Sequence, residues 1–440
     1  MFKQCRRYGA RSIARAATIA AIACAAVPTA QARVEIGAPA ASADATVGCM
    51  FPMTGRAAIY GRDSIAGMRL ALADIAARSP GAPRLRVIID DTRSKASYAV
   101  RMAEDFIARD GARFLCGMVS SGVAHAVSQI AQRHRVIMVG TDHASSRLTV
   151  EALHKYYFRV SNDSYASMAA GGRYLAELQK KTGWTRLAYI APDYDYGHVS
   201  WLDLKDSLDR LGVRYELVGM FWPKLYEPDY SSYLAALQKV EPEIVVTALW
   251  GGDFVAFLKQ AGSTDFFKHT RLANFDTGAN YEVMLALGDY APPGLIVSAR
   301  HHNNWPDTER NRRFVADFHR AENRYPTYAA EGAYSGIMAI AAAIEQAGGV
   351  ADIDAVVRAM EGLRLQLPED PDGFTSYIDP DTHQIVQMQA VGEVVPDTRF
   401  PPARVMPGNW TVYAAEDLKP PPELVRERRA RAAGAATLQP

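Results

Sequence analysis

Short apolar runs alternate along most of the chain with stretches in which apolar residues recur every three or four positions. The first series places apolar runs at 46–51, 85–89, 113–119 and 136–139, and helical spacing at 62–77, 96–109 and 122–134. Strand–helix alternation at this spacing predicts a parallel sheet with helices on both of its faces.

The alternation begins again after residue 186. Strands are predicted at 187–191, 214–220, 244–249, 271–273 and 294–299, and helices at 199–211, 230–240, 254–261, 310–325 and 329–346. Two successive α/β units create a cleft, and open parallel sheets bind ligands beyond the carboxyl ends of their strands. We therefore expect the functional residues in the loops that follow the strands.

Three segments lack this alternation. Residues 33–44 predict a linker of small residues, and 374–395 predict a hairpin. The end of the chain, 413–440, is rich in Pro, Arg and Ala and predicts a loose tail.

Residues 1–32 have the pattern of a secretory signal peptide. They carry five basic residues and no acidic ones, an apolar run at 16–27, and Ala30-Gln31-Ala32 as a cleavage site. The run is too short to span a bilayer in the mature protein. We expect export to the periplasm and removal of residues 1–32, with a buried Ala-rich helix as the alternative.

Charge and composition exclude several kinds of partner. The 440 residues carry a net charge of +1, which becomes −4 when the five basic residues of 1–32 are removed. A mildly acidic protein is a poor partner for nucleic acid or an anionic membrane. No CxxC or Cys/His cluster suggests a metal, and we expect no cofactor.

Two cysteines, Cys49 and Cys116, remain after export, and both lie in predicted strands. The periplasm permits a disulfide. Because the geometry between adjacent strands is often poor for one, we favour buried free thiols and keep pairing as the alternative.

Two loops of the first unit offer ligand contacts. Tyr60 ends the loop after the first strand and supplies an aromatic face and a hydroxyl. Ser120-Ser121-Gly122 comes directly before a helix, whose free N–H groups favour a carboxylate. A tyrosine that packs its own loop, and a serine that only caps the helix, are the alternatives.

The loop at 140–146 is dense in hydrogen-bonding groups and contains Asp142 and His143. Its serines lack the GxSxG pattern of a nucleophile, so we do not expect catalysis there. His301-His302 lacks a supporting ligand pattern, and we expect it on the surface.

The second unit offers three further candidates. Trp250 follows a strand and would form a pocket wall, and Tyr194 lies in another loop that faces the cleft. Asp276 is a carboxylate able to meet an ammonium group or another donor, with a turn or cap role as the alternative.

The run VGCMFPMTGRAAIYGRDSIAGMRLALADI, residues 47–75, resembles the opening of periplasmic binding proteins of the leucine/isoleucine/valine-binding type. These proteins serve ABC importers of branched-chain amino acids. Further matches follow in order to about residue 395: the acidic pair Asp90-Asp91, GMVSSGVAHAV, YYFRVSNDS, DYDYGH, FLKQAG and EGAYSGIMAIAAAIEQAGG.

The resemblance implies a type I periplasmic binding protein. Its fold has two Rossmann-like lobes with parallel sheets, joined by three crossovers and closing over a ligand like a Venus flytrap. By this resemblance, lobe 1 comprises 45–161 plus 299–372, and lobe 2 comprises 162–298 plus 373–412.

The resemblance also implies roles for individual residues. Ser121, with Ser120 adjacent, would hold the α-carboxylate of the ligand, and Tyr60 matches the family's tyrosine in its YG pair. Asp276 would hold the α-ammonium group, and Trp250 would be the aromatic residue of the second lobe.

The stretch TDHASSRLT, which begins at residue 141, departs from the family pattern. Ala144 stands where amino-acid-binding members have a threonine, and Asp142 replaces a small residue. A buried, unpaired Asp142 would be costly, so it should meet a ligand donor, His143 or water. An amino acid, an amide, urea or an aromatic acid all remain candidate ligands.

We therefore expect a periplasmic receptor that is not an enzyme and acts as a monomer. It would capture a small polar, amino-acid-like or aromatic ligand and deliver it to the permease subunits of an ABC importer in the inner membrane. One alternative is a ligand-sensing subunit for a membrane receptor. Another is a periplasmic hydrolase that uses Asp142 and His143.

Overall fold

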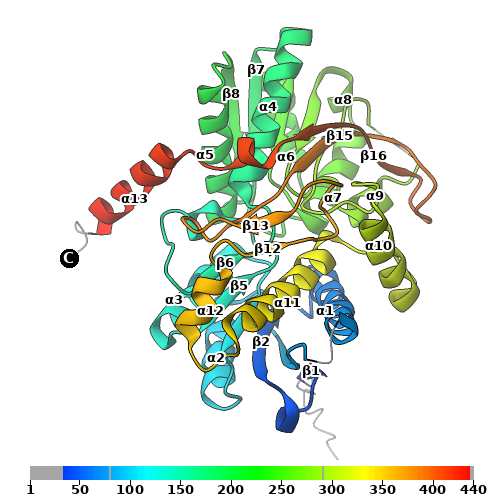
Figure 1. The fold of residues 1–440 in the computed structure, drawn as a ribbon. Helices are drawn as coiled ribbons and strands as arrows, with labels where there is room; N and C mark the ends of the chain where they lie inside the picture. The colour runs from blue at the N-terminus through cyan, green and yellow to red at the C-terminus, as the bar shows by residue number, and fades with distance from the viewer. Residues whose placement is uncertain (1–32, 79–80, 290–291, 437–440) are drawn as a thin grey trace, which may run out of the picture. The chain divides into compact units, whose positions relative to one another are not determined.

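The computed structural model describes residues 33–78, 81–289 and 292–436. The predicted signal peptide lies outside these residues. Strands of the first sheet are blue and cyan in Figure 1, and those of the second are mostly green. None of the helices in the described ranges has the length and apolar character of a bilayer-crossing segment.

The first lobe is built on a six-stranded sheet with the strand order β1-β3-β2-β4-β5-β6. All neighbours are parallel except β1 and β3. The strands are β1 (Val34–Gly37), β2 (Ala45–Phe51), β3 (Leu85–Asp91), β4 (Phe114–Gly117), β5 (Ile137–Gly140) and β6 (Tyr157–Arg159). Its helices are α1 (Ala58–Arg78), α2 (Ala96–Ala108), α3 (Ser121–His134), α10 (Glu309–Glu322), α11 (Tyr328–Ala347) and α12 (Ile353–Met360).

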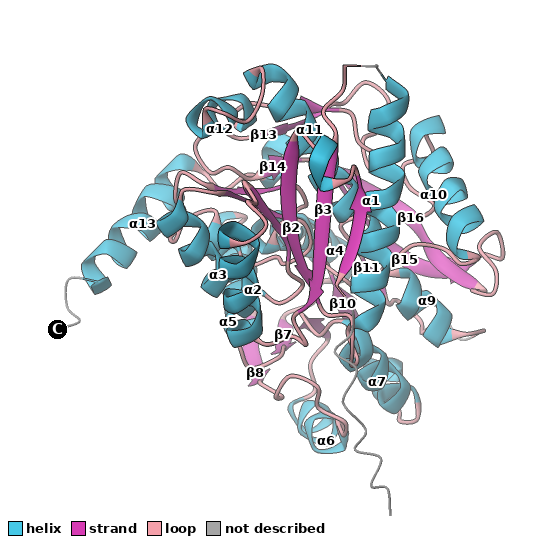
Figure 2. Cartoon of the chain, turned by 90° about the horizontal axis from the view of Figure 1, so that it is seen from below, coloured by secondary structure: helices cyan, strands magenta, loops and turns pink. Residues whose placement is uncertain are grey.

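Alternating side chains of β2 enter two different cores, because successive residues of a strand point to opposite faces. Cys49 and Phe51 pack in the core that contains residues of α1 and α11. Met50 packs in the core that contains residues of α2 and α3. Figure 2 shows β2 and β3 between α1 on one side and α2 with α3 on the other.

The second lobe is built on a seven-stranded sheet with the strand order β16-β15-β11-β10-β9-β7-β8. Strands β7 to β11 are parallel, and β15 and β16 add an antiparallel edge. The strands are β7 (Arg186–Ile190), β8 (Glu216–Phe221), β9 (Ile244–Thr247), β10 (Arg271–Asn274), β11 (Ile296–Val297), β15 (Gln389–Pro396) and β16 (Val405–Tyr413). Its helices are α4 (Ser164–Thr182), α5 (Asp195–Arg210), α6 (Ser231–Val240), α7 (Gly251–Gly262), α8 (Phe266–His269) and α9 (Tyr281–Leu287).

The chain crosses between the lobes after β6, after β11 and before β15. These crossings confirm the predicted class of two α/β lobes with mainly parallel sheets. A small third sheet joins β12 (Arg364–Leu365), β13 (Ser376–Ile378) and β14 (Ile385–Val386). The exact lobe boundaries stay a prediction.

Two segments differ from the sequence-based expectation. The supposed linker contains β1, whose residues pair with β3 from Val34↔Ile89 to Gly37↔Arg86. The expected hairpin at 374–395 is shorter, because β13 and β14 pair with each other while β15 crosses to the second sheet.

Helix α4 was not predicted, since Gly171 and Gly172 interrupt its middle. Both glycines serve close packing. A Cβ at Gly171 would lie 2.2 Å from the ring of Phe275, and one at Gly172 would lie 2.2 Å from Ser207 Oγ. The glycines thus let α4 approach α5 and the loop after β10.

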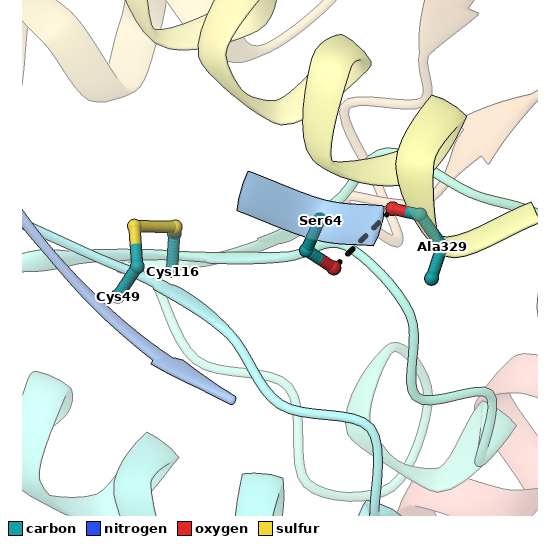
Figure 3. The surroundings of a disulfide bond; sticks show 4 residues. All are labelled: Cys49, Ser64, Cys116 and Ala329. Carbon is teal, nitrogen blue, oxygen red and sulfur yellow. Dashed lines mark hydrogen bonds between the residues drawn. A yellow bond between two sulfur atoms is a disulfide. The ribbon is translucent and has the colours of Figure 1, made fainter. Parts of the chain in front are cut away.

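Cys49 and Cys116 form a disulfide, which corrects the expectation of free thiols. They are directly opposite each other in the parallel register of β2 and β4, with 4.5 Å between their Cα atoms. Figure 3 shows the bond together with the hydrogen bond that Ser64 Oγ of α1 donates to Ala329 O of α11, 3.4 Å long. The facing register brings both sulfurs to the same side of the sheet.

The described part of the expected loose tail, up to residue 436, has regular structure, contrary to that expectation. Residues Pro422–Ala436 form α13, and Leu424 and Val425 are buried. The Arg428 guanidinium lies 2.7 Å from a carboxylate oxygen of Asp203 in α5, which is fully buried. Apolar anchors and a buried ion pair therefore hold the tail, which composition alone did not indicate.

We predict that the Cys49→Ala/Cys116→Ala double variant is less stable than the native protein. The bond closes a loop across a sequence separation of 67 residues, which corresponds to about 4 kcal/mol of lost chain entropy in the unfolded state. Urea unfolding measures the difference, and reduced native protein should match the double variant. Equal free energies of unfolding for the oxidised native protein and the variant would contradict the prediction.

We predict that Arg428→Ala lowers the free energy of unfolding by about 3 kcal/mol, because it leaves the buried Asp203 without its charge partner. Arg431→Ala on the same helix is the matched control. Arg431 pairs with Glu427 at an exposed position, so its loss should cost less than about 1 kcal/mol. Thermal and urea unfolding compare the two variants, and equal effects would show that α13 is not held by Arg428.

Candidate ligand-binding site

A cavity lies between the loops that follow the parallel strands of the two lobes. The cavity is narrow: its non-atom space is about 230 Å³ with open solvent included, and the part that a water-sized molecule can occupy is about 10 Å³. The first lobe contributes loops after β4 and β5, and the second contributes loops after β7, β9 and β10. The lining residues are Val119, Ser121, Asp142, Ala144, Tyr194, Tyr196, Trp250, Thr277, Arg300 and Tyr328.

Ser121 is the first residue of α3 and presents a hydroxyl beside the start of that helix. Its Oγ accepts a hydrogen bond from the backbone N–H of Ser145, 3.2 Å away, so its own hydrogen remains available to donate. Ser120 occupies the N-cap position, makes no side-chain cap bond and does not line the cavity. Ser121 and the helix amides can therefore meet an anionic group.

Aromatic side chains form much of the wall. Trp250 Nε1 donates to Tyr194 Oη over 3.1 Å, which leaves the Tyr194 hydroxyl hydrogen free to donate. Tyr60 lies behind this wall rather than on it: its ring centroid is 6.0 Å from that of Trp250 and 5.6 Å from that of Tyr328. Its hydroxyl donates a short hydrogen bond to Glu282 and so joins the two lobes.

Arg300, which follows β11, is buried at the centre of the charged groups. Its Nε and Nη2 donate to the two carboxylate oxygens of Asp276 over 3.0 and 2.6 Å. Its Nη1 donates to Asp142 Oδ1 over 3.1 Å and also to the Asp142 backbone carbonyl. One guanidinium thus connects a carboxylate of the second lobe with one of the first.

Asp276 has its hydrogen-bonding capacity filled from within the protein. Besides Arg300, Tyr196 Oη donates to Oδ2 over 2.5 Å and Ser167 Oγ donates to Oδ1 over 3.0 Å. Burial by itself would raise the pKa of Asp276, but the Arg300 guanidinium and these donors hold it below the usual value. The carboxylate is therefore ionised and satisfied, and Asp276 does not line the cavity.

Unlike Asp276, Asp142 has only part of its hydrogen-bonding capacity filled, although it is only 1% exposed. Its Oδ1 faces Arg300, whereas Oδ2 is buried and accepts no hydrogen bond from any described residue. Burial raises the pKa of Asp142 to about 7, and the nearby Arg300 opposes that rise. A buried carboxylate oxygen without a hydrogen bond costs free energy unless another molecule supplies a hydrogen-bond donor.

His143 points away from the cavity. One ring nitrogen lies 3.0 Å from Met118 O, and the other lies 2.8 Å from Tyr157 Oη, which also accepts hydrogen bonds from Arg159. Burial and the charge of Arg159 lower the pKa of His143 well below its ordinary value. A neutral histidine with both nitrogens used does not form a catalytic dyad with Asp142.

The expectation of a surface-exposed His301-His302 is wrong, since both are buried. His301 Nε2 lies 2.8 Å from Asn311 Oδ1 of α10, and the His302 ring lies 4.7 Å from that of Trp410. The pair belongs to the crossover between the lobes, where neighbouring elements cover it.

Five of the nine predicted ligand contacts line the cavity: Ser121, Asp142, Ala144, Tyr194 and Trp250. Their ligand contacts stay a prediction. Arg300 and Tyr328 were missed, and Tyr196 lies in the loop that was expected to face the cleft. Arg300 follows a strand, so the rule about carboxyl ends of strands would have found it if applied to the crossover.

We predict that Asp276→Asn lowers the free energy of unfolding by about 3–5 kcal/mol, because the buried guanidinium of Arg300 loses its strongest partner. Asp265→Asn is the control. Asp265 pairs with Lys268 at an exposed position, so its replacement should cost less than about 1 kcal/mol. Urea unfolding at neutral pH measures both, and a cost for Asp276→Asn no larger than that of the control would contradict the prediction.

Comparisons with known proteins agree with this architecture. A family model described as "Periplasmic binding protein" matches residues 44–399. The Leu/Ile/Val-binding protein BraC3 of Rhizobium johnstonii is 26% identical over 74% of this chain and 85% of its own length. The Leu/Ile/Val-binding protein homolog 6 of Brucella melitensis is 24% identical over 83% of this chain and 92% of its own.

Solved structures show the same fold. A periplasmic binding protein from Burkholderia mallei has a TM-score of 0.76 and 20% identity, covering 88% of this chain and 98% of that one. A solute-binding protein from Rhodopseudomonas palustris in complex with 3,4-dihydroxybenzoic acid has a TM-score of 0.75 and 22% identity, covering 84% and 97%. The family match, together with the two lobes and the cavity between them, shows that this chain belongs to the periplasmic binding protein family, in its type I, Leu/Ile/Val-binding branch.

Proposed function

We propose that the protein is a periplasmic receptor that captures a small ligand between its lobes and delivers it to the permease of an ABC importer. The observation that carries this proposal is a narrow cavity lined by strand-end loops of both lobes. Enclosure of this kind suits capture by closure about a hinge, because contacts from both sides stabilise the closed state when a ligand is present.

Residues of the first lobe supply the polar contacts for one end of the ligand. Ser121 and the amides at the start of α3 hold its carboxylate, since a helix N-terminus with a free hydroxyl favours a negative charge. Asp142 accepts from a ligand donor through its unpartnered Oδ2. Ala144, small and buried, leaves space beside them.

Residues of the second lobe close the cavity from the opposite side. Tyr194 donates through its hydroxyl, and Trp250 covers the apolar part of the ligand. Tyr60 strengthens closure through its bond to Glu282. Asp276 contributes by holding Arg300 in place.

Delivery to a permease and location in the periplasm rest on the family and on the predicted signal peptide at 1–32. Relatives named Leu/Ile/Val-binding proteins and solved neighbours that hold benzoates support a small carboxylate ligand. The receptor acts as a monomer and performs no covalent chemistry.

We predict that Ser121→Ala weakens ligand binding by about 1–3 kcal/mol, because the ligand carboxylate loses a hydroxyl donor. A thermal-shift screen of amino acids and benzoates identifies a binder, and isothermal titration calorimetry compares the variants. Ser120→Ala is the matched control and should leave the dissociation constant unchanged, since its side chain lies outside the cavity.

Two results would count against this account. An unchanged dissociation constant for Ser121→Ala would remove the start of α3 from the ligand site. A screen in which no amino acid or carboxylate raises the unfolding temperature would contradict the receptor function itself.

A further inference from the structure

The charged cluster at the cavity carries an excess of negative charge. Asp142 and Asp276 contribute two carboxylates, and Arg300 contributes one guanidinium that both carboxylates share. All three side chains are at least nine-tenths buried, so water screens them poorly. With both carboxylates ionised, the three groups sum to −1.

The two carboxylates are unequal partners for a ligand. Asp276 accepts hydrogen bonds from Arg300, Tyr196 and Ser167, and it does not line the cavity. Asp142 lines the cavity, and its Oδ2 has no partner among the described residues. Arg300 thus forms an ion pair with Asp276, the residue to which the family resemblance assigned the ligand's ammonium group.

We propose that Asp142, rather than Asp276, receives a cationic nitrogen of the ligand and is the residue that selects ligands bearing a basic nitrogen. This inference rests on the proposed receptor function. A ligand nitrogen at Oδ2 supplies the missing hydrogen bond and cancels the excess negative charge in the same contact. A carboxylate ligand without a basic nitrogen would instead add a second negative charge to the closed cavity.

The aromatic wall supports the same assignment. Tyr194, Tyr196 and Trp250 line the cavity together with Asp142. The faces of aromatic rings carry partial negative charge and attract cations, so a ring face turned toward the ligand would favour a basic nitrogen beside a carboxylate. The Tyr328 ring already has the Arg300 guanidinium 4.8 Å from its centroid, and its face is used within the protein.

Because Asp142 is ionisable, the affinity for a cationic ligand should depend on pH. Burial raises the pKa of Asp142 to about 7, and a cationic ligand binds the ionised form better than the protonated form. The ionisable groups that act on it are Arg300, Asp276, Glu282, Tyr60 and Tyr328. Affinity for an amine-bearing ligand should therefore rise between pH 6 and pH 8 and level off above it.

The test uses sets of three probes that share a side chain and carry both the amino group and the carboxylate, the carboxylate alone, or the amino group alone. L-phenylalanine, 3-phenylpropanoate and 2-phenylethylamine form one set, and L-leucine, 4-methylpentanoate and 3-methylbutylamine form the other. Benzoate and 4-hydroxybenzoate are added as rigid carboxylates. Calorimetry or a thermal-shift titration gives the affinity of the full native protein for each probe.

We expect an amine-bearing member to bind the native protein more tightly than its partner without nitrogen. In Asp142→Asn, its affinity should fall at least about thirtyfold, while the affinity of the amine-free carboxylate should stay level or improve. Asp193→Asn, at an exposed position in the loop after β7, is the matched control and should change neither.

Circular dichroism confirms that Asp142→Asn is folded, and the pH profile of the native protein tests the proposal without any variant. Tighter binding of benzoate or of another amine-free carboxylate would overturn the inference while leaving the receptor function intact. Affinity for an amine-bearing probe that falls as pH rises from 6 to 8 would overturn it as well. If no probe binds, both the inference and the receptor function fail.

Discussion

The closed site depends on one guanidinium shared by two carboxylates. Arg300 follows the last parallel strand of the second sheet and reaches Asp276 of its own lobe and Asp142 of the other. A buried cation needs a nearby anion, and this one has two. The arrangement holds the loops after β5, β10 and β11 together. It leaves Oδ2 of Asp142 unpaired, and this oxygen determines the polar character of the cavity. The aromatic residues and Ser121, at the start of α3, line other parts of the cavity.

The contacts of Arg300 also explain how the loop at 140–146 can depart from the pattern that the family resemblance implies. A charged residue at 142 does not stand alone, because Arg300 pairs with one of its oxygens, while the other is buried and has no partner among the described residues. Ala144 lines the cavity beside Asp142. The buried cation Arg300 makes a carboxylate at this position tolerable.

Much of the fold was predictable from the sequence, because apolar periodicity reports burial directly. Strands such as β2 and β9 and helices such as α3 and α11 lie within a few residues of their predicted positions. Long-range features were not predictable. The local sequence does not show that Cys49 faces Cys116 or that the glycines of α4 allow close packing. It also does not show that Arg428 pairs with Asp203. For the site, the strand-end rule pointed to Ser121, Asp142 and Trp250, which line the cavity, but the sequence pattern does not reveal that Arg300 pairs with Asp276.

The central claim is that the closed cleft holds a small molecule with a carboxylate at Ser121 and a basic nitrogen at Asp142. The most direct measurement is native mass spectrometry of protein prepared from the periplasm, followed by denaturation and identification of the molecule released. The account predicts a compact compound with both a carboxylate and a basic nitrogen. Release of a nitrogen-free aromatic acid would contradict it and would require Asp142 to be protonated in the complex.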